Sequence, residues 1–261
     1  MTAGPSGAAR AWVVVAVLAV PTATVLLADR LLWGWRWPDP GLLGPATMAP
    51  AAGIAAVALL RRRLPGLRTA LRPGVDLRVA RRGLFLLAVP AALLVSWNQV
   101  CLLLGWLPVP RIDVSAGMPL PARLVAYIPL ALVQEGAWRG IVLPTLRTAY
   151  GWLTAAAATG VVWGLLSAPT WRFGPLFGAL SVLTTVGWSV LVGAVVADMH
   201  RGQLWAATAF GWGTMVALFL LLPEETGLWE AGWVLATVAL VGGAVAVWLY
   251  GRRRPGQMTI R

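Results

Sequence analysis

Long apolar runs separated by short polar or charged segments dominate this sequence. Eight runs approach the length, about 20 residues, that an α-helix needs to cross the hydrocarbon core of a bilayer. The runs cover residues 11–28, 42–60, 83–107, a stretch that starts near residue 122, 152–168, 175–197, 204–222 and 228–250. Because lipid offers no partner for backbone N–H and C=O groups, helices are the expected form. The pattern predicts an all-α polytopic membrane protein with about eight transmembrane helices in one domain, residues 1–261.

The first run admits a second interpretation, which is a secretory signal peptide. In that case Arg10 would supply the basic n-region, and residues 22–24 would form a weak cleavage site. The apolar run continues beyond this point, which favours a first helix that is retained in the membrane.

Charge is distributed unevenly between the runs. Arginines crowd the segment 61–82, where Asp76 is the lone acid, and a triplet follows the last run at 252–254, whereas residues 224–225 are acidic. Basic loops stay on the cytoplasmic side, so the pattern predicts a multi-pass cell-membrane protein with both termini cytoplasmic. The same arginines are expected to contact anionic lipid headgroups. The net charge of +12 comes without any nucleic-acid-binding motif, so no nucleic acid partner is expected.

Composition narrows the chemistry further. Hydrophobic residues make up 59% of the chain and charged residues only 11%, which is unlike a soluble domain. Cys101 is the single cysteine and His200 the single histidine. One cysteine cannot form an internal disulfide, and this residue set lacks the three or so ligands of a catalytic zinc. We therefore expect no metal and no cofactor, and we interpret His200 as a solvated loop residue.

The most unusual polar residues lie at the end of the fourth apolar run. Glu135 and Arg139 are four residues apart, so they share one helix face with the acid on the N-terminal side. A charged side chain at the centre of a membrane helix costs about 2.5–3.5 kcal/mol, so such residues face a protein interior and find a partner. The pair is either a structural ion pair or a site in which Glu135 handles a proton or water and Arg139 orients it.

The segment that begins Gln134-Glu135 and continues through Trp138-Arg139-Gly140 resembles the first motif of the CPBP family. That family comprises the type II CAAX prenyl endopeptidases and bacteriocin-processing or immunity proteins. Its motif is a Glu-Glu pair, three residues and then Arg. Here Gln134 replaces the first Glu. The resemblance implies a CAAX-protease-like helix bundle with its core at residues 122–222.

Two further family motifs are present without their catalytic residues. The phrase around Trp163 resembles the second motif, an aromatic, three residues and His, but Ser167 occupies the histidine position. By counting from residues 204–205, the third motif, His, three residues and Asn, falls on Gly211 and Met215. The resemblance therefore implies a cavity lined by Trp138, Trp163, Ser167, Gly211 and Met215, from which both histidines and the asparagine are missing.

Three hypotheses remain at the level of sequence. The favoured one is a relative with lost or much reduced peptidase activity that binds a transmembrane or lipidated peptide, or a partner protein, in the retained cavity. The alternative is an active intramembrane endopeptidase that uses Glu135 and Arg139, with Gln134 or Ser167 as substitute donors. A small transporter is the third, and no internal repeat supports it.

Overall fold

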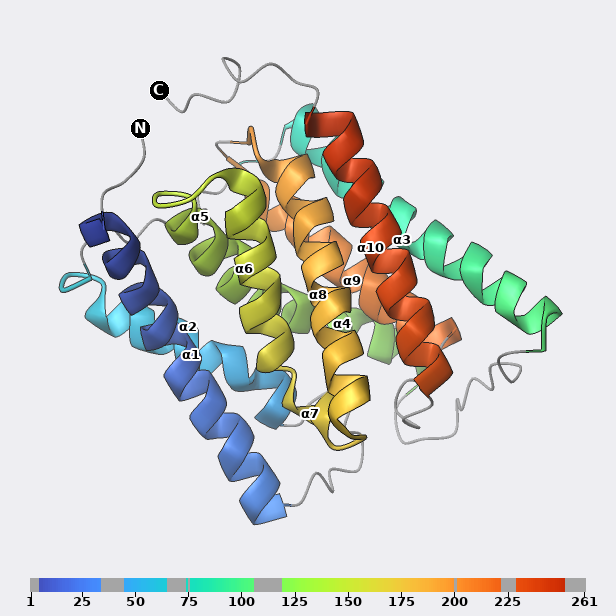
Figure 1. Ribbon diagram of the computed structural model, residues 1–261, viewed down its shortest axis with the longest axis horizontal. Coiled ribbons are helices and arrows are strands. Elements are labelled where there is room, and N and C mark those ends of the chain that lie inside the picture. Colours follow the sequence, from blue (N-terminus) through green and yellow to red (C-terminus); the bar gives the residue numbers. More distant parts are fainter. Residues whose placement is uncertain are drawn as a thin grey trace.

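The computed structural model describes residues 5–33, 45–64, 74, 76–105, 119–199, 201–221 and 229–251, and within these ranges the chain forms helices and no strand. The elements are α1 (Pro5–Trp33), α2 (Pro45–Leu60), α3 (Leu77–Leu103), α4 (Leu120–Ala137), the π-helix η1 (Trp138–Val142), α5 (Leu143–Leu146), α6 (Trp152–Leu165), α7 (Ala168–Trp171), α8 (Pro175–Val196), α9 (Gln203–Leu221) and α10 (Trp229–Gly251). Figure 1 shows them packed into one bundle.

The longer helices coincide with the predicted apolar runs, which confirms the all-α polytopic prediction. Five are long and apolar enough to cross a membrane: Gly7–Leu32, Leu77–Leu103, Pro175–Val196, Gln203–Leu220 and Gly232–Leu249. Two others, Met48–Leu60 and Trp152–Leu165, are apolar but shorter. Helix α4 continues through η1 into α5, so the described chain stays helical from Leu120 to Leu146. Among the described residues, five helices therefore qualify as membrane spans by length and composition alone.

Close packing of α8 against its neighbours organises the centre of the bundle. α8 lies between α6 and α10, and α9 lies between α3 and α4 (Figure 1). Gly160 of α6 allows the backbone of α8 to approach so closely that a Cβ there would lie 2.4 Å from Val186 Cα. Gly187 performs the same role against α10, where a Cβ would lie 2.3 Å from the Ala239 carbonyl carbon. Small residues at such positions are the usual means of close helix packing in membranes.

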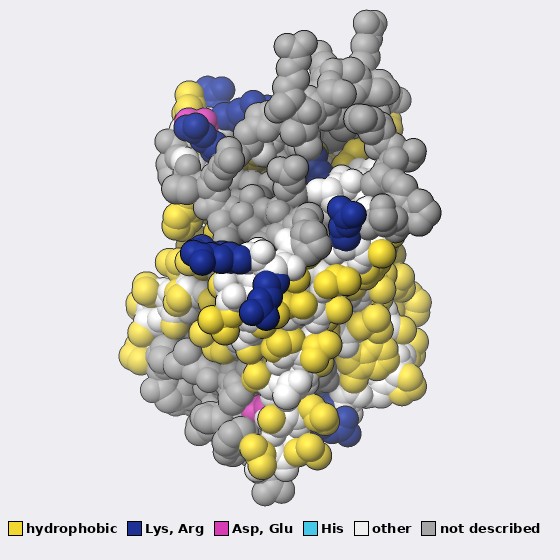
Figure 2. Space-filling model, turned by 90° about the vertical axis from the view of Figure 1, so that its left-hand side faces the viewer, with side chains coloured by type: hydrophobic (Ala, Val, Ile, Leu, Met, Phe, Trp, Pro, Cys, Tyr) yellow, Lys and Arg dark blue, Asp and Glu magenta, His cyan; other side chains and the backbone are white. Residues whose placement is uncertain are grey.

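One end of the bundle collects the arginines. The start of α3, the end of α8 and the end of α10 lie at the top of Figure 1, and α1 begins at the upper left. Figure 2 shows most of the visible arginine side chains in the upper part of that face, above a surface covered by hydrophobic side chains. Exposed arginines are Arg78 and Arg81 near the start of α3, and Arg61, Arg62 and Arg63, which follow α2. This asymmetry is the one on which the topology prediction rests.

Some of the predicted features lie outside the described residues. These are the loop histidine His200, the acidic pair at 224–225 and the arginine triplet at 252–254.

Candidate functional site

Glu135 and Arg139 form the expected ion pair in the interior of the bundle. Arg139 Nη1 donates to Glu135 Oε1 at 3.1 Å, and the exposed fractions of the two side chains are 0% for Arg139 and 2% for Glu135. Arg139 Nη2 also donates to the hydroxyl of Ser189 on α8 at 3.2 Å. Burial removes both ions from water, so their mutual attraction and these hydrogen bonds must offset a desolvation penalty of several kcal/mol for each ion.

A π-helix accompanies the pair. Glu135 is in the last turn of α4, and Arg139 belongs to η1, where the hydrogen-bond ladder widens before α5 begins. A π-helical turn accommodates an additional residue within an α-helix and is frequent at functional sites. All five η1 residues are buried. The widened turn therefore brings an unbroken series of side chains, from Glu135 to Leu143, into the interior.

Aromatic rings enclose the guanidinium of Arg139. Its Cζ lies 4.4 Å from the ring centroid of Trp163 on α6 and 5.9 Å from that of Phe210 on α9. Trp138 in turn stacks on Trp163, with their ring centroids 6.5 Å apart. Cation–π attraction strengthens when the cation is removed from water. The rings thus add to the stabilisation that the Glu135 carboxylate gives to the Arg139 guanidinium.

Several polar atoms of the site have hydrogen-bonding capacity left over. Glu135 Oε2, Trp138 Nε1 and Arg139 Nε are buried without a hydrogen-bond partner in the described part of the chain. They combine one acceptor with two donors on neighbouring turns of the same helical segment. An orphaned buried polar group costs about 1–3 kcal/mol, so three of them within five residues mark this segment as unusual.

Gly211 lies directly against the carboxylate. A Cβ built at this position would lie 3.2 Å from Glu135 Oε1, 3.1 Å from Glu135 Cγ and 3.3 Å from Ala131 Cβ. The motif count therefore identified the residue of α9 that faces Glu135. It also means that Glu135 itself occupies the space into which a side chain at position 211 would project.

The remaining predicted residues are placed less centrally. Ser167 lies beyond the end of α6 and donates its hydroxyl to the Trp163 carbonyl at 3.0 Å, so this hydroxyl serves the local backbone. Met215 packs against Tyr127 and Leu130, one turn of α9 beyond Gly211. Gln134 is half-buried beside Glu135. The structure thus brings Trp138, Trp163 and Gly211 to the ion pair, and records no contact of Ser167, Met215 or Gln134 with it.

Sequence reasoning missed two contacts of the site. Ser189 and Phe210 both touch Arg139, from α8 and α9 respectively. Ser189 had a detectable signal, because a hydroxyl in the otherwise apolar run around it needs a partner. Phe210 gave no such signal, since an aromatic residue in an apolar helix is ordinary.

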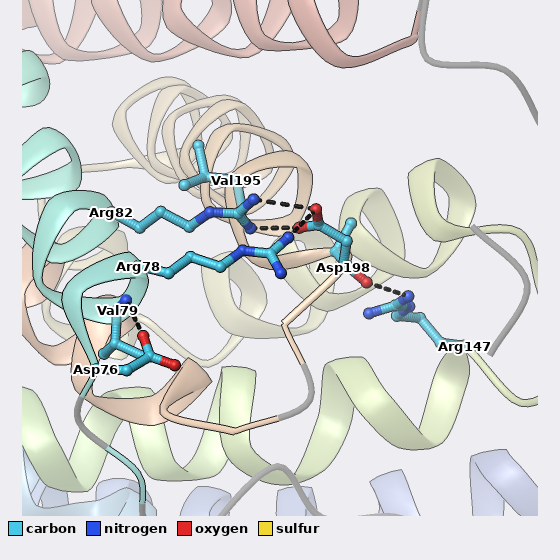
Figure 3. A network of polar contacts seen from close by, with 8 residues as sticks. Asp76, Arg78, Val79, Arg82, Arg147, Val195 and Asp198 are labelled. Atoms are coloured by element: carbon cyan, nitrogen blue, oxygen red, sulfur yellow. Dashed lines mark hydrogen bonds and ion pairs between the residues drawn. The ribbon is translucent and has the colours of Figure 1, made fainter. Parts of the chain in front are cut away.

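A second ionic cluster lies at the arginine end and was not predicted. Asp198, just after α8, accepts hydrogen bonds from Arg82 and, at 2.5 Å, from Arg78 Nη2, both of α3. Arg82 also donates to the Val195 carbonyl at 2.5 Å, and Arg147 donates to the Ala197 carbonyl at 2.8 Å. Figure 3 shows the guanidinium groups of Arg78 and Arg82 converging on the Asp198 carboxylate, and Arg147 donating to the neighbouring backbone carbonyl. The cluster ties the start of α3 to the ends of α8 and α5.

The electrostatics of this cluster follow from its charge ratio. Burial by itself would raise the pKa of Asp198, but the hydrogen bond and charge of Arg82, with the charge of Arg78, outweigh it and lower the pKa to about 2. Burial lowers the pKa of Arg147, and the charge of Asp198 opposes that effect. Asp198 is therefore ionised throughout the physiological range.

Ligands for a metal do not gather in the described ranges, where no group of three or more His, Cys, Asp or Glu side chains is found. The donor set at Glu135 consists of one carboxylate beside a guanidinium. That set does not fit a zinc centre, which needs about three protein ligands.

Comparisons with known proteins agree with the motifs. Residues 116–214 match the model of the family described as type II CAAX prenyl endopeptidase Rce1-like. Over 180 residues the chain is 26% identical to lysostaphin resistance protein A of Staphylococcus epidermidis RP62A, covering 67% of this chain and 46% of that protein. The protein of the same name from Staphylococcus aureus RF122 is 26% identical over 115 residues, covering 43% of this chain and 27% of the relative.

This chain therefore spans about half the length, or less, of the curated relatives it matches. The matched segment 116–214 contains Glu135, Arg139, Trp163 and Gly211, which are the residues that the structure brings together. Through this segment the chain is similar to the Rce1-like, type II CAAX prenyl endopeptidase family.

Proposed function

We propose that this chain is a CAAX-protease-like membrane protein that has lost most or all peptidase activity and binds a transmembrane or lipidated peptide, or a partner protein, through its retained fold. The observation that carries the proposal is the contact between Gly211 and Glu135. The family motif implies an imidazole at position 211, and here the Glu135 side chain fills that space. A hydrolytic site needs both an activated water and donors aimed at the developing oxyanion.

The closed packing around Glu135 supports the same conclusion. Its carboxylate accepts a hydrogen bond from Arg139, Gly211 of α9 lies against it, and 1% of the residue is exposed. A water could act as nucleophile only if it reached this carboxylate. In comparable hydrolases, loss of one oxyanion donor lowers the rate about 10²–10³-fold. A site that lacks two imidazoles is therefore expected to hydrolyse peptides far more slowly than a complete family site.

The alternative is an endopeptidase that works with other donors, and one observation favours it. Trp138 Nε1 and Arg139 Nε are buried donors without a partner among the described residues, and Glu135 Oε2 is an acceptor in the same condition. An entering peptide carbonyl would satisfy such donors, and a water would satisfy the free carboxylate oxygen. In this hypothesis Glu135 is the general base and Arg139 orients it.

A cleavage assay distinguishes the inactive relative from the active endopeptidase. The purified protein in liposomes is incubated with a fluorogenic farnesylated CAAX peptide and, separately, with a single-span transmembrane peptide. We expect a rate indistinguishable from that of Glu135→Gln, which keeps the shape of the side chain but cannot act as a carboxylate base. Cleavage that depends on Glu135 would overturn the proposal and support the alternative.

Restoring the missing groups provides the complementary test. The triple variant Gln134→Glu, Ser167→His, Gly211→His should gain Glu135-dependent cleavage if the scaffold still positions a substrate. A Cβ at position 211 would lie 3.1–3.3 Å from Glu135 and Ala131, so the Glu135 side chain must move out of this space to admit the imidazole. The same triple variant carrying Glu135→Gln is the matched control.

We further infer that the arginine end of the bundle faces the cytoplasm, with both chain termini on that side. The crowding of exposed arginines at the end where α1 and α3 begin supports this orientation (Figure 2). Reporter fusions after Arg82 and after Arg254 should both report a cytoplasmic location. A periplasmic signal from either fusion would contradict the inference.

A further inference from the structure

An apolar groove runs between α3, α8 and α10, on a part of the molecule remote in sequence from the Glu135 segment. Its volume is about 110 Å³, and every residue that lines it is apolar. Leu191, Gly242 and Ala246 form a buried floor, while Phe85, Val245 and Leu249 form rims that are 37%, 49% and 46% exposed. The exposed rims mean that the groove opens sideways, toward the hydrocarbon that surrounds a membrane protein.

The groove points toward the arginine end. Phe85 lies in the third turn of α3, which begins at that end, and Leu249 lies in the last turn of α10, which finishes there (Figure 1). The α3 side of the groove is the row Phe85, Val89, Leu93, with a spacing of four residues. One step back along this row is Arg81, because residues four apart lie on the same helix face.

By this spacing, Arg81 is the arginine that continues the Phe85 row toward the arginine end. It is exposed, whereas its neighbour Arg82 is turned to Asp198 in the cluster of Figure 3. Arg78, which is 56% exposed on the side-chain level, lies one turn earlier and adds positive charge nearby. The described cluster sets three arginines against one aspartate, so this end carries an excess of positive charge.

We propose that this groove is a binding site for one anionic glycerophospholipid, with an acyl segment between α3 and α10 and the phosphate on Arg81. An apolar trough that opens to lipid and ends in an exposed guanidinium matches the two parts of that ligand in the order in which a bilayer presents them. The floor has no polar atom that would bind a peptide backbone or hold water.

Gly242 supplies a test that leaves the fold intact. A Cβ at this position would meet Leu191, Leu93 and Trp188 at 3.6 Å each, which is ordinary van der Waals contact. Gly242→Ala therefore raises the floor of the groove without forcing any atom to move. Displacing about one methylene of the lipid from the floor predicts about fourfold weaker lipid binding.

The experiment is native mass spectrometry of the full chain in a mild detergent, titrated with phosphatidylglycerol, with phosphatidylcholine and with inorganic phosphate. We expect retention of one phosphatidylglycerol in preference to phosphatidylcholine, and no competition from inorganic phosphate. Arg81→Gln should weaken phosphatidylglycerol binding about fivefold and leave phosphatidylcholine unchanged. Gly242→Ala should weaken both lipids. Arg62→Gln, at an exposed arginine that does not line the groove, is the matched control and should change neither.

The proposal fails if wild-type protein binds the two lipids equally, if Arg62→Gln lowers binding as much as Arg81→Gln, or if inorganic phosphate displaces the lipid. Photolabelling of the unmodified protein with a phosphatidylglycerol that carries a photoactivatable acyl chain tests the site even if Arg81→Gln folds poorly. Label in the unmodified protein should concentrate on peptides that contain Phe85 and Val245. Label spread evenly over the lipid-facing helices would overturn the site.

Discussion

Two ionic clusters in the described part of the chain differ in how their charge is balanced. In the interior, one carboxylate meets one guanidinium at 3.1 Å, both are almost fully buried, and aromatic rings cover the cation. At the arginine end, Asp198 is shared between guanidinium groups whose exposure ranges from 14% for Arg82 to 56% for Arg78. Charge is balanced one to one where water is absent, and it is in excess where water or lipid headgroups can solvate it.

This difference has an energetic reason. A buried ion cannot be solvated by water when its partner is removed. The desolvation cost of the remaining ion is then uncompensated. A partly exposed arginine recovers most of its lost interaction from water, and such pairs contribute about 0–1 kcal/mol. Substitutions in the two clusters should therefore differ in size, and the following variants test whether they do.

The largest loss is expected from Arg139→Ala. This change leaves Glu135 buried without its partner, which costs about 3–5 kcal/mol, and it also removes the group that Trp163 and Phe210 enclose. Resistance to unfolding by denaturing detergent, measured in micelles, reports the loss. The double variant Glu135→Leu, Arg139→Leu should recover most of it, because no lone charge remains. If the double variant is as unstable as the single one, the charge argument is wrong.

Asp198→Asn should produce a smaller loss, about 1–2 kcal/mol after allowance for solvent screening, because it leaves Arg82 and Arg78 without their counter-ion. The native pKa of Asp198 is about 2, below its ordinary value of 3.8, so its stabilising effect is present above about pH 4 and is lost as the pH falls toward 2. Stability of the wild type should thus decrease over that range more than stability of Asp198→Asn. Parallel acid profiles would contradict the assignment.

Gly211→Ala should cost about 1 kcal/mol, through overpacking against Glu135. The measurement is a double-mutant cycle with Glu135→Ala, since the added methyl should be tolerated once the carboxylate is removed. Gly242→Ala is the comparison, because its Cβ meets ordinary contact distances and the change should be neutral or slightly stabilising. Additive effects of Gly211→Ala and Glu135→Ala would show that the two residues do not touch.

Arg78→Ala should have the smallest effect, below about 1 kcal/mol, since this side chain is 56% exposed. The same unfolding measurement made at low and high salt should show that even this small effect is screened. A loss as large as that of Arg139→Ala would remove the distinction between the two clusters.

Much of the architecture was predictable from the pattern of apolar runs. Every helix of fourteen or more residues in the described chain lies within or across a predicted run, because lipid leaves the backbone few alternatives. The spacing of Glu135 and Arg139 predicted their pairing, and the motif count identified Gly211 as the residue opposite Glu135. Both predictions depended on short-range helix geometry or on a known family pattern.

What could not be predicted depends on contacts between distant segments. The hydroxyl of Ser167 was expected at the site but is committed to the Trp163 carbonyl, a choice that depends on where α6 ends. The π-helix at 138–142 has no sequence signature in this chain. Asp198 was a possible counter-ion for the arginine-rich loop. The charge pattern of the sequence alone, however, does not show that the end of α8 lies beside the start of α3.

The π-helix also gives this segment a tolerance that ordinary helices lack. Deleting one residue from an α-helix rotates everything beyond it by about 100°, which would turn a buried face toward lipid. In Trp138–Val142 the backbone already carries one residue more than α-helical geometry requires. A chain shortened by one residue there would relax to a plain α-helix and keep α5 on its side of the bundle, so this segment can lose a residue beside the Glu135–Arg139 pair without turning a buried face toward lipid.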